Sequence, residues 1–582
     1  MLHAKKADFK GLGNALKVDQ VLARIMVNRG LSTVEEMQAY LNPSLDNIAS
    51  PHLLKDMDRA CDLLIEAINQ NKKIRVIGDY DVDGIMSTYI LTNAIKKAGG
   101  DVDYTVPHRI IDGYGVNEDI VKTAHEDKVE FIITCDNGIA AKNAVKTAKD
   151  FGMTFVITDH HEVPYEEIDG TKKFILPEAD AIVDPKQENC EYPFSGICGA
   201  QVAWKLSYVL FEKLGIDKKN ADEYLEFAAI ATVCDVMELR GENRATVFYG
   251  LKALEKTENP GLHALLARND LEDKKLSCYH LGFVIGPCLN ATGRLDTAKK
   301  AIELLNEEEP AKALAVADEL VELNIQRKSM TLEGLEAAKS CVEDMGLTND
   351  RVLVIYLPSL HESLAGIVAG RIKETYYKPT LVITDCEDGA KGSGRSIEAY
   401  NMYEELNKVK DVFTKFGGHP MAAGISLPVE KIDELRRRLN ENCTLKPEDL
   451  EEIVRIDVPL PLSYISEELI EQISTLEPFG NGNTKPLFGL TKVPFVRAAY
   501  MGRENQFLRL TVKTENGLYL QALLFRDVEE FLLLVEEKYG KQKVDELFSG
   551  KGQGIEMDII YEPQINEYRD TKSIQIVINN FK

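Results

Sequence analysis

Short apolar runs alternate with helical segments between residues 71 and 300. The runs span residues 74–77, 102–106, 131–135, 154–158 and 181–183, and each has the length of a buried strand. Strands separated in this way by helices are typical of βαβ units, so the pattern predicts an α/β fold with a parallel, doubly wound sheet. In such sheets the functional side chains gather beyond the carboxyl ends of the strands.

Acidic residues follow these runs repeatedly. Four of the five runs are followed at once, or after a single glycine, by an aspartate: Asp79, Asp136, Asp159 and Asp184. Because the carboxyl ends of parallel strands meet at one edge of the sheet, we expect these side chains to form a single acidic pocket.

The heptapeptide GDYDVDG (78–84) carries three aspartates at alternate positions. Carboxylates this close raise one another's pKa and cost stability unless a cation neutralises them, and hard divalent cations take oxygen ligands. An EF-hand loop begins in the same way, but its twelfth position requires a glutamate, and here it is Ile90. A haloacid-dehalogenase-type phosphatase has apolar residues directly before its acidic pair, where this chain has Gly78-Asp79-Tyr80. An acidic turn without a metal is the remaining alternative.

Later segments add further candidate ligands. Asp136 stands in the turn CDNG, and Asp159 is followed directly by His160 and His161. The apolar run 228–234 ends at Asp235, another candidate donor. A mixed set of carboxylates and imidazoles suits Mn²⁺ or Mg²⁺ better than Zn²⁺, which favours more cysteine or histidine ligands.

A second α/β pattern begins near residue 351, after helical spacing from 311 to 344 that predicts a long helix. That helix either packs along one domain or joins two domains. The second pattern contains two glycine-rich segments, KGSGRS (391–396) and GGHPMAAG (417–424), each of which alone is a plain glycine-rich turn. Together their N–H groups, hydroxyl and guanidinium favour anion binding. Neither segment is a Walker A loop, because the chain has no G-x-x-x-x-G-K-[ST] sequence.

The C-terminal region has strand character at residues 507–512, 519–525, 555–561 and 573–578, with a helix predicted at 527–539. Several short strands with one interposed helix favour an OB-like barrel, a fold that binds single-stranded nucleic acid in a groove. Phe507, Tyr519 and Phe525 could stack on bases, although core packing is the commoner role of strand aromatics. A purely structural β domain is therefore the alternative.

Composition narrows the class of protein. A length of 582 residues predicts three or four domains. There is no apolar run of transmembrane length, and the first residues lack a secretory signal. Ten scattered cysteines are typical of reduced thiols, so we expect a cytoplasmic protein. A net charge of −25 argues against a generally basic nucleic-acid coat but not against a local basic groove.

The motifs resemble a known superfamily. GDYDVDG (78–84), CDNG (135–138), TDHH (158–161) and ATVCDV (231–236), in this order, are similar to the motifs of DHH phosphoesterases. GPCLNATGRL (286–295) and EPFGNGN (477–483) narrow the resemblance to RecJ-type single-strand-specific exonucleases. The implied organisation is a helical segment packed on the core (1–70), a DHH catalytic domain (71–300), a connecting helix (301–348), a smaller DHHA1-like domain that clamps substrate (349–445) and an OB-like nucleic-acid-binding domain (455–582).

The resemblance also implies roles for individual residues. The implied ligands of two divalent ions, Mn²⁺ or alternatively Mg²⁺, are Asp81, Asp83, Asp136, His160 and Asp235. The implied catalytic residues are Asp159 and His161, which orient ligands or contact the phosphate, His161 being the better candidate to protonate a leaving oxygen. The implied substrate-binding residues are Ser393, Arg395 and Arg109, which hold a terminal phosphate, with Gly418 and His419 near the substrate backbone. The chain departs from many relatives at Ile77, where they carry a histidine, so one ion is expected to have fewer protein ligands.

These observations predict a metal-dependent exonuclease that degrades single-stranded DNA from the 5′ end in repair and recombination. We expect a monomer, away from membranes, with a single-strand-binding protein and a helicase as candidate partners. A DHH-type phosphodiesterase for short oligonucleotides or cyclic dinucleotides is the alternative among enzymes. A nucleic-acid-binding subunit with an inactive metal site is the alternative from another class.

Overall fold

The computed structural model describes residues 5–168, 171–387, 389–568 and 571–582. The chain forms two compact units. The larger unit comprises residues 48–237 and 245–452, and the smaller unit comprises the N-terminal 47 residues, residues 238–244 and residues 453–582. No helix in the described part of the chain is long and apolar enough to cross a membrane.

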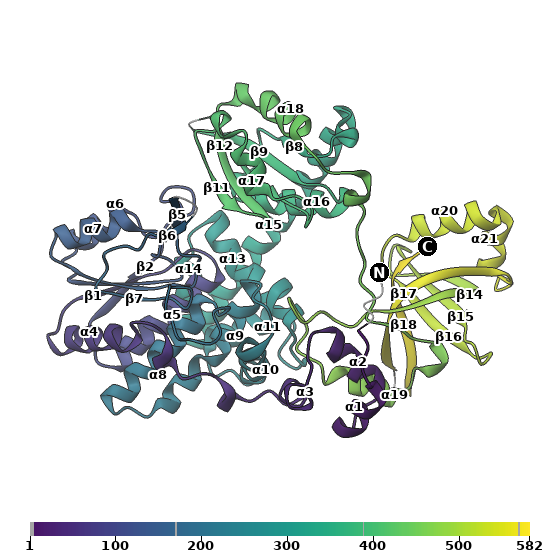
Figure 1. The fold of residues 1–582 in the computed structure, drawn as a ribbon, viewed down its shortest axis with the longest axis horizontal. Coiled ribbons are helices and arrows are strands. Elements are labelled where there is room, and N and C mark those ends of the chain that lie inside the picture. The colour runs from purple at the N-terminus through teal and green to yellow at the C-terminus, as the bar shows by residue number, and fades with distance from the viewer. Residues whose placement is uncertain (1–4, 169–170, 388, 569–570) are drawn as a thin grey trace. The chain divides into compact units, whose positions relative to one another are not determined.

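A five-stranded parallel sheet with the order β2-β1-β3-β4-β7 forms the first part of the larger unit. Its strands are β1 (Ile74–Ile77), β2 (Val102–Thr105), β3 (Phe131–Cys135), β4 (Thr154–Thr158) and β7 (Ala181–Val183). Helices α6 (Glu118–Glu126) and α7 (Lys142–Asp150) cover one face, and α4 (Met57–Asn69), α5 (Val82–Lys97) and α8 (Gly199–Leu214) cover the other (Figure 1). The predicted parallel, doubly wound sheet is confirmed. Its strands are continuous apolar runs because helices bury both faces.

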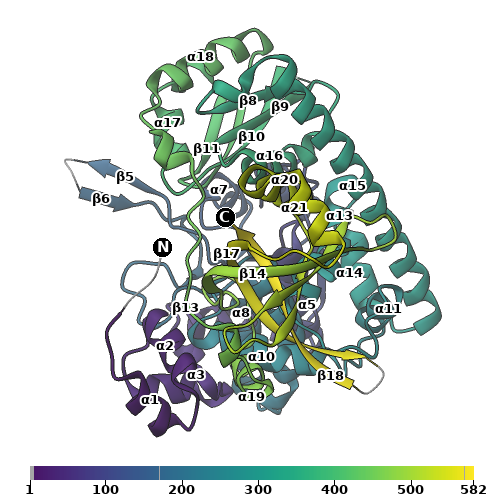
Figure 2. The ribbon, with the colours of Figure 1, turned by 90° about the vertical axis from the view of Figure 1, so that its right-hand side faces the viewer.

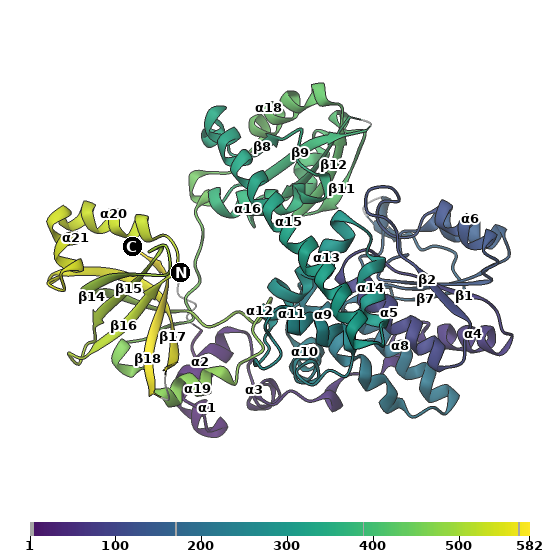
Figure 3. The same ribbon diagram turned by 180° about the vertical axis from the view of Figure 1, so that it is seen from behind.

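A long helix, α15 (Pro310–Asp344), joins this sheet domain to a second α/β domain. Its first turns pack beside α11 (Pro260–Arg268), α13 (Gly286–Leu295) and α14 (Lys299–Asn306), as Figure 3 shows. Ala317 and Leu320 are buried in these turns. Its last turns place Ala338 and Val342 in the apolar core of the second domain. Of the two roles that the sequence left open for this helix, the structure therefore supports the joining role.

The second α/β domain contains a mixed sheet with the order β11-β12-β10-β9-β8. Its strands are β8 (Leu353–Tyr356), β9 (Thr380–Cys386), β10 (Gly389–Arg395), β11 (Lys415–His419) and β12 (Ala422–Leu427), and α16 (Ala365–Tyr376) packs on it. The interpretation of the two glycine-rich segments as turns is wrong, because most of both segments is strand. Glycine in a strand allows close approach of neighbours: a Cβ at Gly392 would lie 2.9 Å from the Ile383 side chain.

The C-terminal part of the smaller unit is a closed barrel, as predicted. Its sheet has the order β13-β14-β15-β16-β18-β17, and β14 pairs with β17 to close it (Figure 2). The strands are β13 (Val458–Pro459), β14 (Phe488–Met501), β15 (Phe507–Lys513), β16 (Tyr519–Leu524), β17 (Ile555–Tyr568) and β18 (Thr571–Phe581), with α20 (Val528–Tyr539) and α21 (Lys541–Phe548) before β17. The sequence does not predict β14, because Gly489 and Pro494 interrupt its strand pattern. In the structure, Lys492 of this strand has a left-handed backbone.

The N-terminal segment divides between the two units, which differs from the single segment expected for residues 1–70. Helices α1 (Phe9–Leu16), α2 (Gln20–Asn28) and α3 (Val34–Leu41) belong to the smaller unit, whereas α4 packs on the parallel sheet. The Asn28 side chain donates a hydrogen bond to the Asp457 carbonyl at 2.9 Å. Ile25 of α2 and Leu469 of α19 (Glu467–Ser474) share one apolar core. An amphipathic helix must bury its apolar face, but its own residues do not specify which partner covers it.

Candidate metal centre

The aspartates of the first motif lie between β1 and α5. Asp81 is the N-terminal cap of α5, and its Oδ1 accepts a hydrogen bond from the Gly84 N–H at 3.1 Å. Asp83 is buried, and its carboxylate accepts bonds from the Gly199 and Ala200 N–H groups, at 2.6 and 2.7 Å, at the start of α8. The exposed N–H groups of a helix N-terminus favour a negative charge. These two backbone N–H groups therefore position the Asp83 carboxylate, and no positively charged side chain is needed to do so.

Asp136 follows β3 with a left-handed backbone, at a φ of 60°. A non-glycine residue adopts this conformation at a cost, and such residues are found at functional sites. Space around it is limited, because a Cβ at Gly199 would lie 2.7 Å from the Asp136 Cβ. The Tyr114 hydroxyl donates a hydrogen bond to the Asp136 carbonyl at 3.0 Å. These contacts direct the Asp136 carboxylate into the centre.

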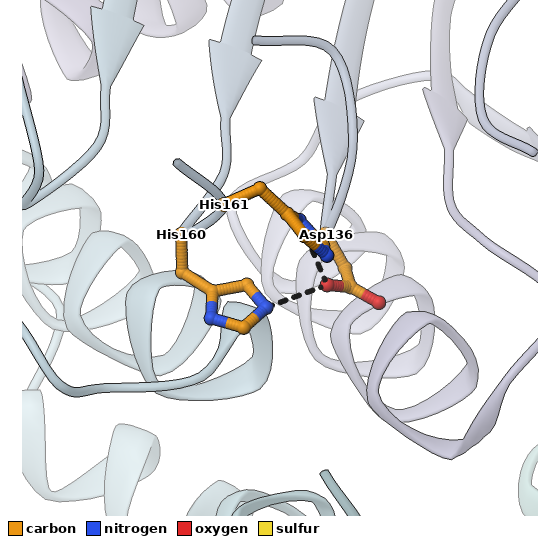
Figure 4. A group of neighbouring side chains, drawn as sticks. All are labelled: Asp136, His160 and His161. Carbon is orange, nitrogen blue, oxygen red and sulfur yellow. Dashed lines mark hydrogen bonds and ion pairs between the residues drawn. The ribbon is translucent and has the colours of Figure 1, made fainter. Parts of the chain in front are cut away.

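His160 and His161 follow β4 and point toward Asp136 (Figure 4). The Nε2 atom of His160 lies 3.1 Å from Asp136 Oδ1, 3.4 Å from Asp83 Oδ2 and 3.6 Å from Asp235 Oδ2. Asp235 reaches this position from the C-terminal end of α9 (Leu225–Cys234), so its apolar run is a helix. The side chains here form three overlapping groups of three residues, and within each group the donor atoms lie within 4.8 Å of one another. The members are Asp79, Asp81, Asp83, Asp136, His160, His161 and Asp235.

All five residues predicted to bind metal are members of these groups, and their role as ligands stays a prediction. Asp79 is an additional member that the predicted ligand set lacks. Asp184 is buried after β7 but belongs to none of these groups; its Oδ1 accepts a bond from the Lys186 N–H. Ile77 is buried in the apolar core beside the sheet.

The electrostatics of the centre fit a hard divalent cation. Burial raises the pKa of Asp136 well above its usual range, and the negative charges of Asp83 and Asp81 raise it further. Burial and the same two carboxylates raise the pKa of Asp235 to about 8. Asp235 Oδ2 is buried without a hydrogen-bond partner among the described residues. Carboxylates crowded in this way are stabilised by a cation, and their oxygens suit Mn²⁺ or Mg²⁺.

Asp159 and His161 form a separate pair at the edge of the centre. Asp159 Oδ1 lies 2.8 Å from His161 Nδ1, and Asp159 Oδ2 accepts a bond from the Ile139 N–H at 2.9 Å. Burial alone would lower the pKa of His161, but the hydrogen bond and charge of Asp159 raise it to about 9. The contact with Asp159 therefore favours the protonated form of the His161 ring. Its side chain is 43% exposed, which leaves it accessible to a substrate.

Beside these residues, a cleft of about 520 Å³ lies between the two α/β domains of the larger unit. Its lining includes Arg109 and Tyr114 from the first domain and Lys391 and Ser393 from the second. Arg395 donates a hydrogen bond to the Ser393 hydroxyl at 3.1 Å. Of the predicted phosphate-binding residues, Arg109 and Ser393 line the cleft, and Arg395 contacts Ser393 without being among the described lining residues.

Gly418 and His419 are not among the described residues that line this cleft, although Gly417 of the same strand is. His419 is exposed at the end of β11, and its Nδ1 accepts a bond from the Met421 N–H at 3.3 Å.

Sequence reasoning missed Arg294 and Tyr114. Arg294 donates a hydrogen bond to the Ser363 carbonyl at 2.6 Å. Burial lowers its pKa to about 9, and the neighbouring guanidinium of Arg109 contributes. Cations held together in this way favour a bound anion. Arg294 lies within the segment 286–295, but nothing in the helical spacing there indicates its function.

An acidic and imidazole centre at the carboxyl edge of a parallel sheet, beside a cationic cleft, defines a metal-binding phosphoesterase. The family models that match the chain are the N-terminal domain of the DHH family at residues 73–232, the DHHA1 domain at 349–444 and the RecJ OB domain at 456–580. The chain belongs to the RecJ family of single-stranded-DNA-specific exonucleases.

Individual relatives support this assignment. The chain is 33% identical to the single-stranded-DNA-specific exonuclease RecJ of Bacillus subtilis, over 98% of this chain and 69% of that protein. It is 30% identical to the RecJ exonuclease of Salmonella typhimurium, over 96% and 95% of the two chains. The crystal structure of RecJ in complex with Mn²⁺ from Thermus thermophilus superposes with a TM-score of 0.81 at 25% identity, covering 100% of this chain and 79% of that one.

Proposed function

We propose that this chain is a metal-dependent exonuclease that hydrolyses single-stranded DNA from a 5′ end. One observation carries the proposal: Tyr114 belongs to both halves of the site. It lines the cationic cleft, and its hydroxyl lies 3.0 Å from the Asp136 carbonyl and 3.1 Å from His161 Nε2. A terminal phosphate bound in the cleft would therefore place the next phosphodiester beside the acidic centre.

The residues that would hold the metal ions are Asp81, Asp83, Asp136, His160 and Asp235. Asp79 is a further candidate ligand, because its carboxylate lies close to those of Asp81 and Asp136. Divalent ions supply Lewis acidity, which neutralises the phosphodiester and makes water a better nucleophile. The chain's own contribution is to position the strand and to move a proton. His161, held by Asp159, carries a proton that it can donate to the leaving oxygen. Ser393, Arg395, Arg109 and Arg294 would hold the terminal phosphate.

The polarity can be tested with a single strand labelled at either its 5′ or its 3′ end and digested in Mn²⁺. We expect the 5′ label to appear first in the smallest products, while the 3′ label stays on progressively shorter strands. A chelator should stop both reactions. Early release of the 3′ label, or equal digestion of a blunt duplex, would contradict the proposal.

The outer face of the barrel would hold the rest of the strand. Arg509 and Lys513 are exposed on β15, and Lys513 lies opposite the exposed Tyr519 of β16. Cations that contact phosphates, interleaved with aromatic rings that stack on bases, make a binding surface that tolerates any sequence. We also expect the protein to act in the cytoplasm, in DNA repair and recombination.

Replacing Tyr519 with alanine should weaken binding to long single strands by about 1–3 kcal/mol for each stacked base that is lost. The turnover of short strands at saturating concentration should be unchanged, because Tyr519 belongs to neither the acidic centre nor the cleft. Affinities should be measured by fluorescence anisotropy at fixed salt, since phosphate contacts weaken as salt rises. Leu533→Ala, at a side chain of α20 that is 61% exposed, is the matched control. Unchanged affinity in Tyr519→Ala would mean that this face does not bind the strand.

A further inference from the structure

Two aromatic side chains near the metal centre, Tyr279 and Phe283, stack on each other while remaining in solvent. Their ring centroids are 5.2 Å apart with an interplanar angle of 22°. Tyr279 is 64% exposed and Phe283 is 62% exposed. Two stacked rings in solvent offer a flat apolar surface whose burial by a ligand would be favourable.

The backbone under these rings is unusual. Three segments follow one another without a break: α12 (Cys278–His280), the π-helical turn η4 (Leu281–Ile285) and α13. A π-helical turn inside a helix is rare and occurs frequently at functional sites. It is the widened turn that carries Phe283.

This turn packs directly on the segment that carries Asp235. The Cys234 thiol donates a hydrogen bond to the Leu281 carbonyl, with a sulfur–oxygen distance of 3.6 Å. A Cβ at Gly286 would lie 2.4 Å from the Cys234 sulfur, so only glycine allows this approach. Cys234 immediately precedes Asp235. The turn that carries Phe283 is therefore packed against the residue that precedes one of the predicted metal ligands.

The same helix carries Arg294 near its other end, where the guanidinium donates a hydrogen bond to the carbonyl of Ser363, a residue that lines the cleft. Phe283 and Arg294 are separated by about 16 Å at a rise of 1.5 Å per residue. Along this helix, Arg294 lies at one end, and the contact with the Asp235 segment, made by Leu281 and Gly286, lies at the other end together with the aromatic pair. A strand whose terminal phosphate is bound in the cleft beside Ser363 and which passes Asp235 would continue toward Tyr279 and Phe283.

We propose that Tyr279 and Phe283 form a stacking platform for the bases on the 3′ side of the cleaved phosphodiester. This inference rests on the proposed function, since it requires a single strand in the site. An unpaired base offers a flat π face whatever its identity, so two exposed rings hold a strand without selecting its sequence. Paired bases have their faces covered by neighbours, so the platform favours single strands over duplexes.

The test compares Tyr279→Ala and Phe283→Ala with the ring-retaining variants Tyr279→Phe and Phe283→Tyr. The substrates are a short 5′-phosphorylated oligothymidylate and the same strand with abasic sites after the first phosphodiester. Phe151→Ala is the matched control. Phe151 is 40% exposed and stacks on His125 at 4.1 Å, but it lies at the C-terminal end of α7, at the sheet edge opposite the metal centre.

Each alanine variant should raise KM for the intact strand by about fivefold or more, the loss that follows from removing one stacked base. The value of kcat at saturation should stay close to wild type, and the ring-retaining and control variants should behave as wild type. On the abasic strand the wild type should already have the raised KM, and the alanine variants should lose nothing more.

The inference is overturned if the alanine variants keep the wild-type KM, or if they lose as much on the abasic strand as on the intact one. The second result would assign the rings to packing or to a protein partner. Failure of the proposed function would look different, because the wild type would then cleave neither strand. In that case anisotropy with the intact oligothymidylate decides: weaker binding by the alanine variants supports the platform, and equal or absent binding rejects it.

Discussion

Replacing Asp136 with asparagine is expected to reduce kcat by roughly a thousandfold or more, because a metal ligand supplies several kcal/mol of transition-state stabilisation. Asparagine matches the shape of aspartate and tolerates the left-handed backbone at this position. The fold should therefore survive. It should even gain stability in the absence of metal, since one of several crowded carboxylates is removed.

The measurements are kcat over a titration of Mn²⁺ and the melting temperature with a chelator present. Asp184→Asn is the matched control, because Asp184 lies buried at the same edge of the sheet but outside the groups of neighbouring donors. That variant should retain its activity. Near-normal turnover of Asp136→Asn at saturating Mn²⁺ would rule out Asp136 as a ligand.

Replacing Arg395 with alanine should remove most of the preference for a 5′-phosphorylated strand over a 5′-hydroxyl strand. A charge-assisted hydrogen bond contributes about 1.5–3 kcal/mol, which corresponds to a preference roughly ten- to 150-fold smaller. Burial and the nearby Arg109 lower the pKa of Arg395, so the arginine is held without a compensating anion until a phosphate binds. The variant should consequently remain folded.

The preference is the ratio of kcat/KM for the two strands, measured for the wild type and for each variant. Arg395→Lys should keep part of it, because lysine retains the charge but not the planar fork of donors. Arg371→Ala, which removes an exposed arginine paired with Glu374, should keep all of it. If Arg395→Ala discriminates as well as the wild type, another group binds the terminal phosphate.

The parallel sheet was predictable because its strands are buried on both faces. β1 and β3 coincide with their apolar runs, and the acids beyond the strand ends meet because parallel topology brings those ends to one edge. The roles of Asp81, Asp159 and the other motif residues came from resemblance rather than from spacing.

Other features depend on contacts between distant segments, which no local pattern encodes. Tyr114 lies in a loop after β2, and only the folded chain brings its hydroxyl to Asp136 and His161. The glycines of β10 suggested a turn because their sequence does not reveal the side chains that press against them. The N-terminal helices are clear in the sequence, but the core that buries them is assembled from residues more than four hundred positions away.

The helix α15 connects the two domains that carry the two halves of the candidate site. One of its ends is embedded in the domain that carries the acidic centre, and the other is embedded in the domain that carries Ser393. Helices are stiff, and each residue added or removed shifts one end by 1.5 Å and rotates it by about 100°. A residue added to or removed from α15 would therefore change both the distance and the angle between the acidic centre and Ser393, and it would also disturb the hydrogen bond from Arg294 to the Ser363 carbonyl.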